Sequence, residues 1–159
     1  MNTPSSTQPA TMVKAIIPTL YDTDFNLWIE ETVRQLKQGD LQSLDLDNLI
    51  EEIESMGRSD KREVKNRLIV LMIHLLEWRY QPEKRSNSWT ATINEQRRQL
   101  GLITGDSPSL KPFLVDNFPG CYQIARRDAV RETFLSLSVF PLDCPFSLAE
   151  ILNAEFFPD

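Results

Sequence analysis

The sequence predicts an all-α protein, a compact multi-helix bundle around a central apolar helix at about residues 60–80. Residues 68–76 contain no polar side chain except that of His74, the only histidine. A helix that is apolar on nearly every side must be surrounded by other protein. Elsewhere apolar residues recur every three or four positions, and no segment alternates polar and apolar residues as a half-buried strand would.

Size and composition indicate an ordinary globular chain. With 159 residues, 41% of them apolar and 25% charged, one core is the natural expectation, and we expect a single helical domain over residues 21–159. Residues 1–20 are expected to form a flexible arm, since their first half is rich in Ser, Thr, Pro and Gln. No run suits a membrane span or a secretory signal. We therefore expect a cytoplasmic protein that makes no membrane contact, with Cys121 and Cys144 as buried, reduced thiols.

The first half of the chain predicts three helices. One runs from Phe25 to Gly39, after capping oxygens from residues 21–24. A second spans about residues 45–56, and the third spans about 60–80 and stops before Pro82. Gly57, followed by a serine and an aspartate at 59 and 60, favours a break between them. The same residues are compatible with one kinked, continuous helix.

The second half predicts further helices and an irregular, proline-containing segment. A fourth helix is expected over about 88–103, and the pair at 107–108, Ser then Pro, predicts the start of a fifth. Pro119 and Gly120 should break or kink that helix, and another follows over 121–135. Ser147 and Glu150 form a capping box that opens a short last helix over about 148–154. Two phenylalanines beyond it, at 156 and 157, should dock on the body.

The charge is unevenly distributed. Residues 22–60 hold eleven acidic and three basic side chains, whereas residues 61–98 hold nine basic and four acidic ones. The two parts could pair once folded, or a basic face could stay open to an anionic partner. The net charge of −6 opposes general nucleic-acid binding, and internal pairing is therefore favoured.

A polar stripe beside the core face of the central helix is the first candidate site. Its main members are Arg67, His74, Trp78 and Gln81, and buried polar groups need partners. A second helix packed antiparallel could supply them, including Glu51 and Glu54. One hypothesis is a metal-dependent hydrolase or nuclease centred on His74 and these glutamates. The other is a structural network with no metal and no cofactor, which the lack of a second histidine favours.

The turn at residues 78–98 is the second candidate, for binding an anion or a nucleic acid. Arg79, Arg85 and Arg97 are interleaved there with aromatic residues such as Trp89, as single-stranded nucleic-acid sites require. In the alternative interpretation, which is favoured, the tryptophans are core anchors and the arginines reach acidic side chains of the first two helices.

Several distinctive strings occur in a fixed order along the chain. They are Tyr21-Asp22-x-Asp24-Phe25-x-x-Trp28, the run from Asn48 to Gly57, His74-Leu75-Leu76-x-Trp78-x-Tyr80-Gln81-Pro82, Ser88-Trp89 and Ser107-Pro108-Ser109-Leu110. With them the chain, from Tyr21 to Asp159, resembles the bacterial domain-of-unknown-function family number 29. The family usually shows an uninterrupted helix where this chain has its proline and glycine at 119 and 120.

The resemblance implies a small, soluble, all-α bacterial protein with no established activity. Its recurring residues include matches to Glu51, Glu54, His74, Trp78 and Trp89, and it transfers no catalytic role to them. The sequence therefore favours a non-catalytic protein-interaction or accessory module over an enzyme. Its expected partners are another protein or a second copy of itself, and the acidic first two helices would suit a basic partner.

Overall fold

The protein is all-α. A computed structural model describes residues 19–159, so residues 1–18 of the arm predicted over residues 1–20 lie outside them. The helical elements are α1 (Leu20–Thr23), α2 (Phe25–Gln38), α3 (Leu46–Tyr80), η1 (Pro82–Lys84), α4 (Asn87–Asp106), α5 (Leu110–Thr133), η2 (Leu137–Val139) and α6 (Leu148–Leu152). Residues 19–159 contain no strand. No helix in that range is long and apolar enough to cross a membrane.

Contacts between residues divide the chain after Ile53 into two compact units. We call residues 19–53 the N-terminal unit and Glu54–Asp159 the larger unit. The expectation of one domain over residues 21–159 stays a prediction.

The N-terminal unit comprises α1, α2 and the start of α3. As predicted, α2 begins after Asp24, whose side chain accepts a hydrogen bond from the backbone N–H of Leu27. It ends at Gly39, which has φ 71° in the left-handed region. Tyr21, Phe25 and Trp28 pack together with ring centroids 5.0–5.7 Å apart. The sequence therefore defines both ends of this helix correctly, while the single turn of α1 before it was not predicted.

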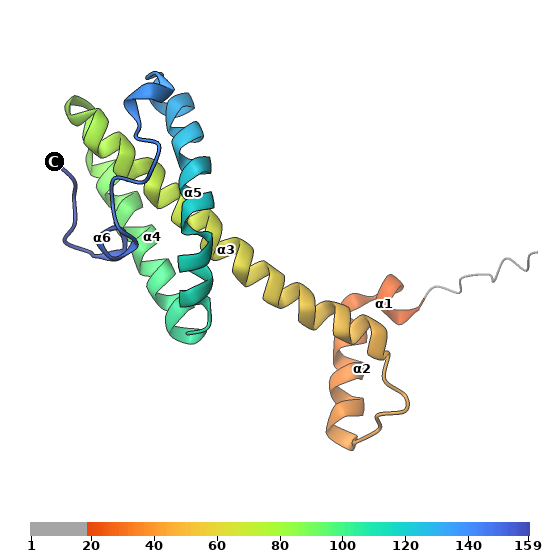
Figure 1. Ribbon diagram of the computed structural model, residues 1–159. Helices are drawn as coiled ribbons and strands as arrows, with labels where there is room; N and C mark the ends of the chain where they lie inside the picture. Colours follow the sequence, from red (N-terminus) through yellow and green to blue (C-terminus); the bar gives the residue numbers. More distant parts are fainter. Residues whose placement is uncertain (1–18) are drawn as a thin grey trace, which may run out of the picture. The chain divides into compact units, whose positions relative to one another are not determined.

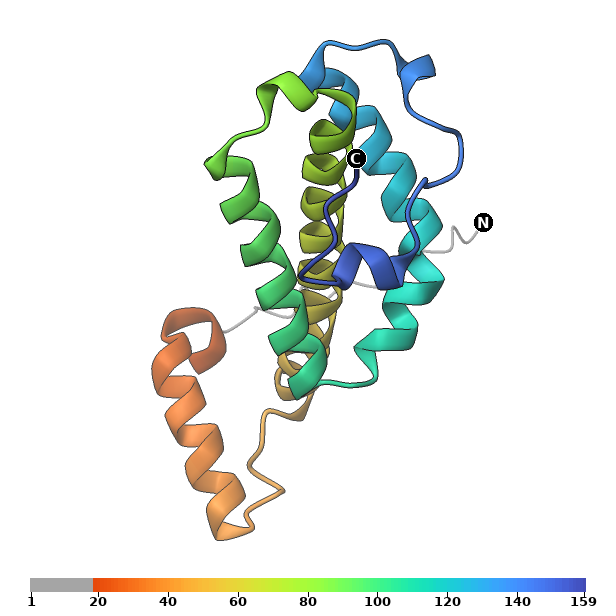
Figure 2. The ribbon, with the colours of Figure 1, turned by 90° about the vertical axis from the view of Figure 1, so that its left-hand side faces the viewer.

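The larger unit packs the second half of α3, α4 and α5 side by side (Figures 1 and 2). The predicted core face of α3 is confirmed, because Val64, Leu68, Leu71, Met72 and Leu75 are fully buried. Ile93 and Leu100 of α4 and Leu114 and Ala125 of α5 complete much of the same core. Figure 2 shows α6 and the C-terminal residues lying across the face between α4 and α5.

The predicted break at Gly57 is wrong, because α3 runs without interruption from Leu46 to Tyr80. A helix-ending glycine takes a positive φ, as Gly39 does, and Gly57 does not. An ion pair between Glu54 and Arg58, 3.3 Å long, spans this position in helical register. One helical glycine costs only about 1 kcal/mol, and a 35-residue helix sustains it.

The predicted break at Pro119 is also wrong, since α5 continues through it to Thr133, and the alternative of a kink stays a prediction. A helical proline removes the hydrogen bond to the carbonyl four residues earlier, here that of Val115. Both residues lie on the exposed side of the helix, where water can satisfy that carbonyl. The helix begins at Leu110, three residues after Ser107, which instead caps the end of α4.

The capping box at the last helix is confirmed. The Ser147 hydroxyl accepts from the backbone N–H of Glu150, whose carboxylate accepts from the backbone N–H of Ser147 at 2.7 Å. Phe146 and Ile151, on either side of the cap, are both buried as a hydrophobic staple requires. Phe157 docks on Trp78, with ring centroids 4.9 Å apart. The C-terminal segment is thereby fixed to the body at both of its ends.

Candidate functional site

His74 pairs with a residue of its own helix. Its Nδ1 lies 2.5 Å from Oε2 of Glu77, one turn further along α3. The Glu77 side chain is 7% exposed and that of His74 is 23% exposed. A nearly buried carboxylate needs a hydrogen-bond partner, and the His74 imidazole is that partner for Glu77.

The remaining polar stripe also has its partners nearby. Arg67 donates to Oε1 of Glu63 at 2.7 Å and to Oε1 of Gln96 on α4 at 3.3 Å. The buried amide of Gln81 donates to the backbone oxygen of Thr133, the last residue of α5, at 3.1 Å. Among residues 19–159, every buried polar side-chain atom has a hydrogen-bond partner. The stripe thus joins α3 to both of its neighbours.

The second-helix glutamates belong to α3 itself and do not form an antiparallel neighbour. The predicted packing was wrong because it required the break at Gly57. Glu54 pairs with Arg58, and Glu51 is exposed on the first turns of α3. The part of the chain that the structure describes contains no group of three His, Cys, Asp or Glu side chains able to hold a metal. The metal-dependent hypothesis therefore has no ligand set within residues 19–159.

At the turn after α3, a basic side chain lies against an aromatic one. The guanidinium of Arg85 lies 5.0 Å from the ring centroid of Trp78. It donates to the backbone oxygens of Trp78, at 2.9 Å, and of Pro158, at 3.2 Å. Arg79 lies over the rings of Tyr80 and Phe146. These two guanidiniums contact aromatic rings and the C-terminal chain.

Arg97 is a buried arginine that binds the C-terminal segment. It is 7% exposed, and its guanidinium donates to three backbone oxygens of the C-terminal segment, those of Ile151, Ala154 and Phe156, at 2.6–3.3 Å. Burial lowers the pKa of this guanidinium from its ordinary value, because the charged form loses solvation. The planar fork with five donors suits this task. Arg97 thus anchors the C-terminal segment to α4, while half-buried Trp89 lies in the first turn of that helix.

The two cysteines are free, as expected. Burial raises the pKa of both thiols, so the protonated, weakly nucleophilic form prevails. Cys144 and Tyr122 line a cavity of about 230 Å³ beside the middle of α5. The Tyr122 hydroxyl donates to the backbone oxygen of Pro141 at 2.7 Å, and burial raises its pKa to about 12. These properties indicate that the two cysteines and Tyr122 contribute to packing.

Two surfaces were missed at the sequence level. One is an exposed apolar face of the N-terminal unit, formed by residues of α2 and of the start of α3. The other is a groove of about 400 Å³ between α3 and α5, which we call the basic groove. It is lined by Arg58, Lys61, Arg62, Lys65, Asn66, Ile69, Phe113 and Ile124. The helical spacing of its four basic residues was visible in the sequence, while the apolar floor depends on how α5 packs.

Comparison with known proteins agrees with the motif resemblance. No curated protein and no solved structure matches the chain. A family model matches residues 20–157, which include all of the helices described above. The chain therefore belongs to the family described as Domain of unknown function DUF29.

Proposed function

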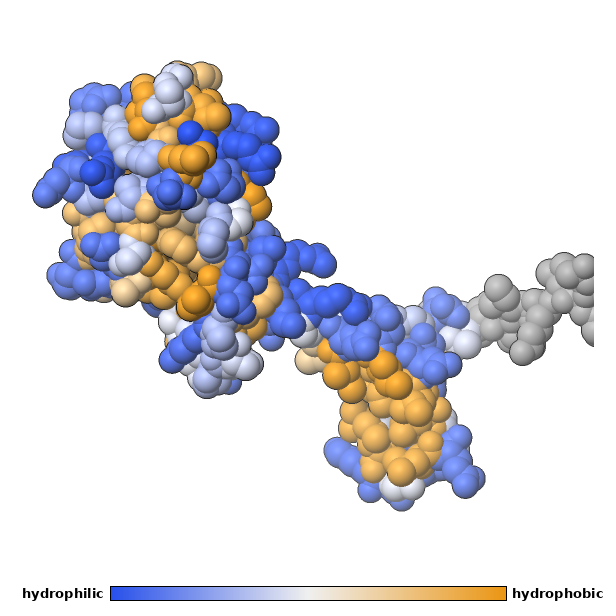
Figure 3. Space-filling view, viewed as in Figure 1, coloured by the Kyte–Doolittle hydropathy of each residue, from blue (hydrophilic) through white to orange (hydrophobic). Residues whose placement is uncertain are grey.

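We propose that this protein is a non-catalytic interaction module that binds another protein through its N-terminal unit. The observation that carries the proposal is an exposed apolar face on that unit. Its members are 40–59% exposed and are Phe25, Ile29, Val33, Leu36, Leu46, Ile50 and Ile53. We call this set the N-terminal apolar face, and Figure 3 shows apolar residues gathered on this unit.

Helical geometry places these residues on two stripes. At 100° per residue, the four on α2 fall within about 80° of the helix circumference, and the three on α3 within about 60°. Each stripe has the three- and four-residue spacing of a seam between packed helices. The face is therefore patterned as a helix-packing surface.

The N-terminal unit has very little core of its own. Among residues 19–53 the buried side chains are Trp28 and Thr32. Polar contacts hold the unit together, including the bonds from Tyr21 to Glu52 at 2.6 Å and from Trp28 to Asp45 at 3.3 Å. A unit of this size cannot be stable with so little buried surface. A partner that covers its apolar face would add the buried apolar surface that stability requires.

Charge selects the chemistry of the partner. Residues 19–53 hold nine acidic and two basic side chains, a net charge of −7. The complementary surface is a helical protein face with an apolar centre and a basic border. The proposal places this interaction in the bacterial cytoplasm, which the two free thiols support.

Binding of designed peptides to the full chain tests the proposal. Two labelled amphipathic helical peptides share one apolar stripe and differ only in carrying lysines or glutamates beside it. Fluorescence anisotropy should show binding of the lysine peptide and little of the glutamate peptide. Ile50→Asp should weaken binding about tenfold or more, because burying an isoleucine contributes about 1.5–3 kcal/mol.

Leu102→Asp is the matched control, since Leu102 lies on α4 and is 52% exposed, close to the 47% of Ile50. It should leave peptide affinity unchanged. Failure of both peptides to bind, or equal losses in the two variants, would overturn the proposal.

A further inference from the structure

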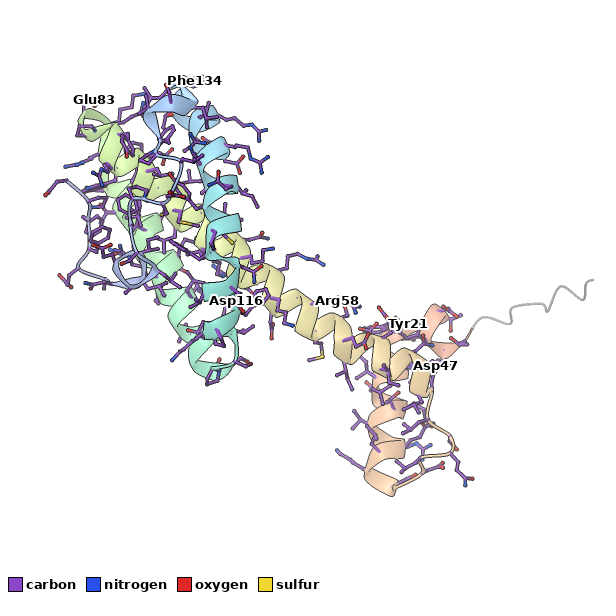
Figure 4. The ribbon with its side chains drawn as sticks, in the orientation of Figure 1. Tyr21, Asp47, Arg58, Glu83, Asp116 and Phe134 are labelled. Carbon is purple, nitrogen blue, oxygen red and sulfur yellow. The ribbon has the colours of Figure 1, made fainter. Side chains whose placement is uncertain are left out.

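The basic groove has the features that the proposed partner surface requires. Its basic residues stand at positions 58, 61, 62 and 65 of α3, a spacing that places them along one side of the helix. Its floor is apolar and half-buried, formed by Ile69 of α3 with Phe113 and Ile124 of α5. Lys61 lies over the Phe113 ring, 5.6 Å from its centroid. Figure 4 marks Arg58 on α3 and Asp116 on α5, two helices that contribute to this groove.

The lining of the basic groove contains no acidic residue. Arg58 is paired with Glu54, whereas Arg62 is exposed and Lys65 is half-buried at the groove wall. A positive border around an apolar floor attracts an acidic amphipathic helix and disfavours a basic one. The ligand class is therefore an acidic helix with an apolar face.

The N-terminal unit of this chain has that same chemistry. It carries a net charge of −7 and an exposed apolar stripe on α2. We infer that the basic groove of one copy binds the N-terminal apolar face of a second copy, so that two chains exchange their N-terminal units reciprocally. The inference rests on the proposed function and names the partner.

Reciprocal exchange is a better arrangement than pairing of two identical faces. Two N-terminal units face to face would bring a charge of −7 against −7, which costs association energy. In the exchange, each acidic face meets a basic groove, and two equivalent contacts close a symmetric dimer. The apolar face and the groove of each copy are then both covered by the other copy.

Charge-swapped variants of the full chain test the inference. Analytical ultracentrifugation of the unchanged protein should show a dimer that weakens as salt is raised. Arg62→Glu with Lys65→Glu cancels the net positive charge of the groove lining, and Glu30→Lys with Asp47→Lys changes the net charge of the N-terminal unit from −7 to −3 at exposed acids of α2 and of the first turn of α3. Each double variant should dimerise at least tenfold more weakly. Lys84→Glu with Arg127→Glu, which changes the charge equally outside the groove, should dimerise normally.

Mixing the two reversed variants is the decisive step. In the mixture one contact keeps its original charges, and in the other the new lysines of one variant meet the new glutamates of its partner, so the heterodimer should form with affinity restored. Circular dichroism shows in parallel that both variants are folded. A monomeric unchanged protein, or a mixture that stays monomeric while both variants are folded, overturns the inference. If that monomer still binds the lysine peptide, the proposed function stands and only the second copy is excluded as partner.

Discussion

The guanidinium of Arg97 donates a 2.6 Å hydrogen bond to the backbone oxygen of Phe156, although the two residues are 59 positions apart. Arg97→Lys should lower the free energy of unfolding by about 3 kcal/mol, because a lysine cannot reach three separated carbonyls. Urea unfolding measures the loss, and faster amide exchange over residues 146–157 locates it.

The adjacent Arg98→Lys variant is the control for Arg97. Arg98 is exposed and pairs with Glu95 one turn away, so the change should cost little. Equal stability of the two lysine variants would contradict the anchoring role of Arg97.

The pair of His74 and Glu77 predicts a strongly non-additive response. His74→Leu leaves the nearly buried Glu77 carboxylate without its partner and should cost about 2 kcal/mol of stability. The double variant His74→Leu with Glu77→Met removes both polar groups and should cost less than the single one. Thermal and urea unfolding of the unchanged protein, of each single variant and of the double variant complete the cycle. Additive losses would show that the two side chains do not act together.

Tyr122 predicts a stability change at alkaline pH. At neutral pH, Tyr122→Phe should cost about 1 kcal/mol through loss of the bond to Pro141. The folded pKa is raised to about 12, whereas an unfolded tyrosine ionises near 10. The unfolded chain therefore loses its proton first, and the stability from Tyr122 declines as the pH rises from about 10 to 12. Urea unfolding at pH 8 and pH 11 should show the gap between the two proteins narrowing, and a constant gap would refute this.

Phe134 predicts a stabilising substitution. It caps α5 in the left-handed region at φ 59°, and it is 90% exposed, so its ring has little packing to lose. Phe134→Gly should raise the free energy of unfolding by about 1 kcal/mol. Phe134→Ala keeps the strained Cβ and should stay within about 0.5 kcal/mol of the parent. A loss of stability in the glycine variant would mean that the phenyl ring makes a stabilising contact.

Local sequence signals identified the helices well and their interruptions poorly. Gly39 and Gly57 look alike in sequence, yet only Gly39 takes a positive φ. Pro119 has a strong breaking tendency, but buried neighbours such as Leu114 and Tyr122 hold α5 together around it. The energy of a buried helix face exceeds the cost of one unfavourable residue, and that energy depends on tertiary packing.

The helical spacing of Arg67, His74, Trp78 and Gln81 predicted one polar stripe, whereas the hydrogen-bond partners of His74 and Gln81 were not predicted. Glu77, the partner of His74, stands three residues further on at helical spacing, whereas an antiparallel helix was expected to supply that partner. Arg97 could not be assigned from sequence, because backbone oxygens are acceptors at every position. The role of such an arginine becomes visible only when the chain that supplies those oxygens has been placed.

The small core of the N-terminal unit also has a consequence for folding during synthesis. Residues 19–53 leave the ribosome before residues 54–159, with Trp28 and Thr32 as their buried side chains. Such a segment buries too little apolar surface to stay folded before the rest of the chain is synthesised. Residues 19–53 must then become ordered only after a complementary apolar surface has been synthesised. Until then, chaperones would encounter them as an unfolded segment.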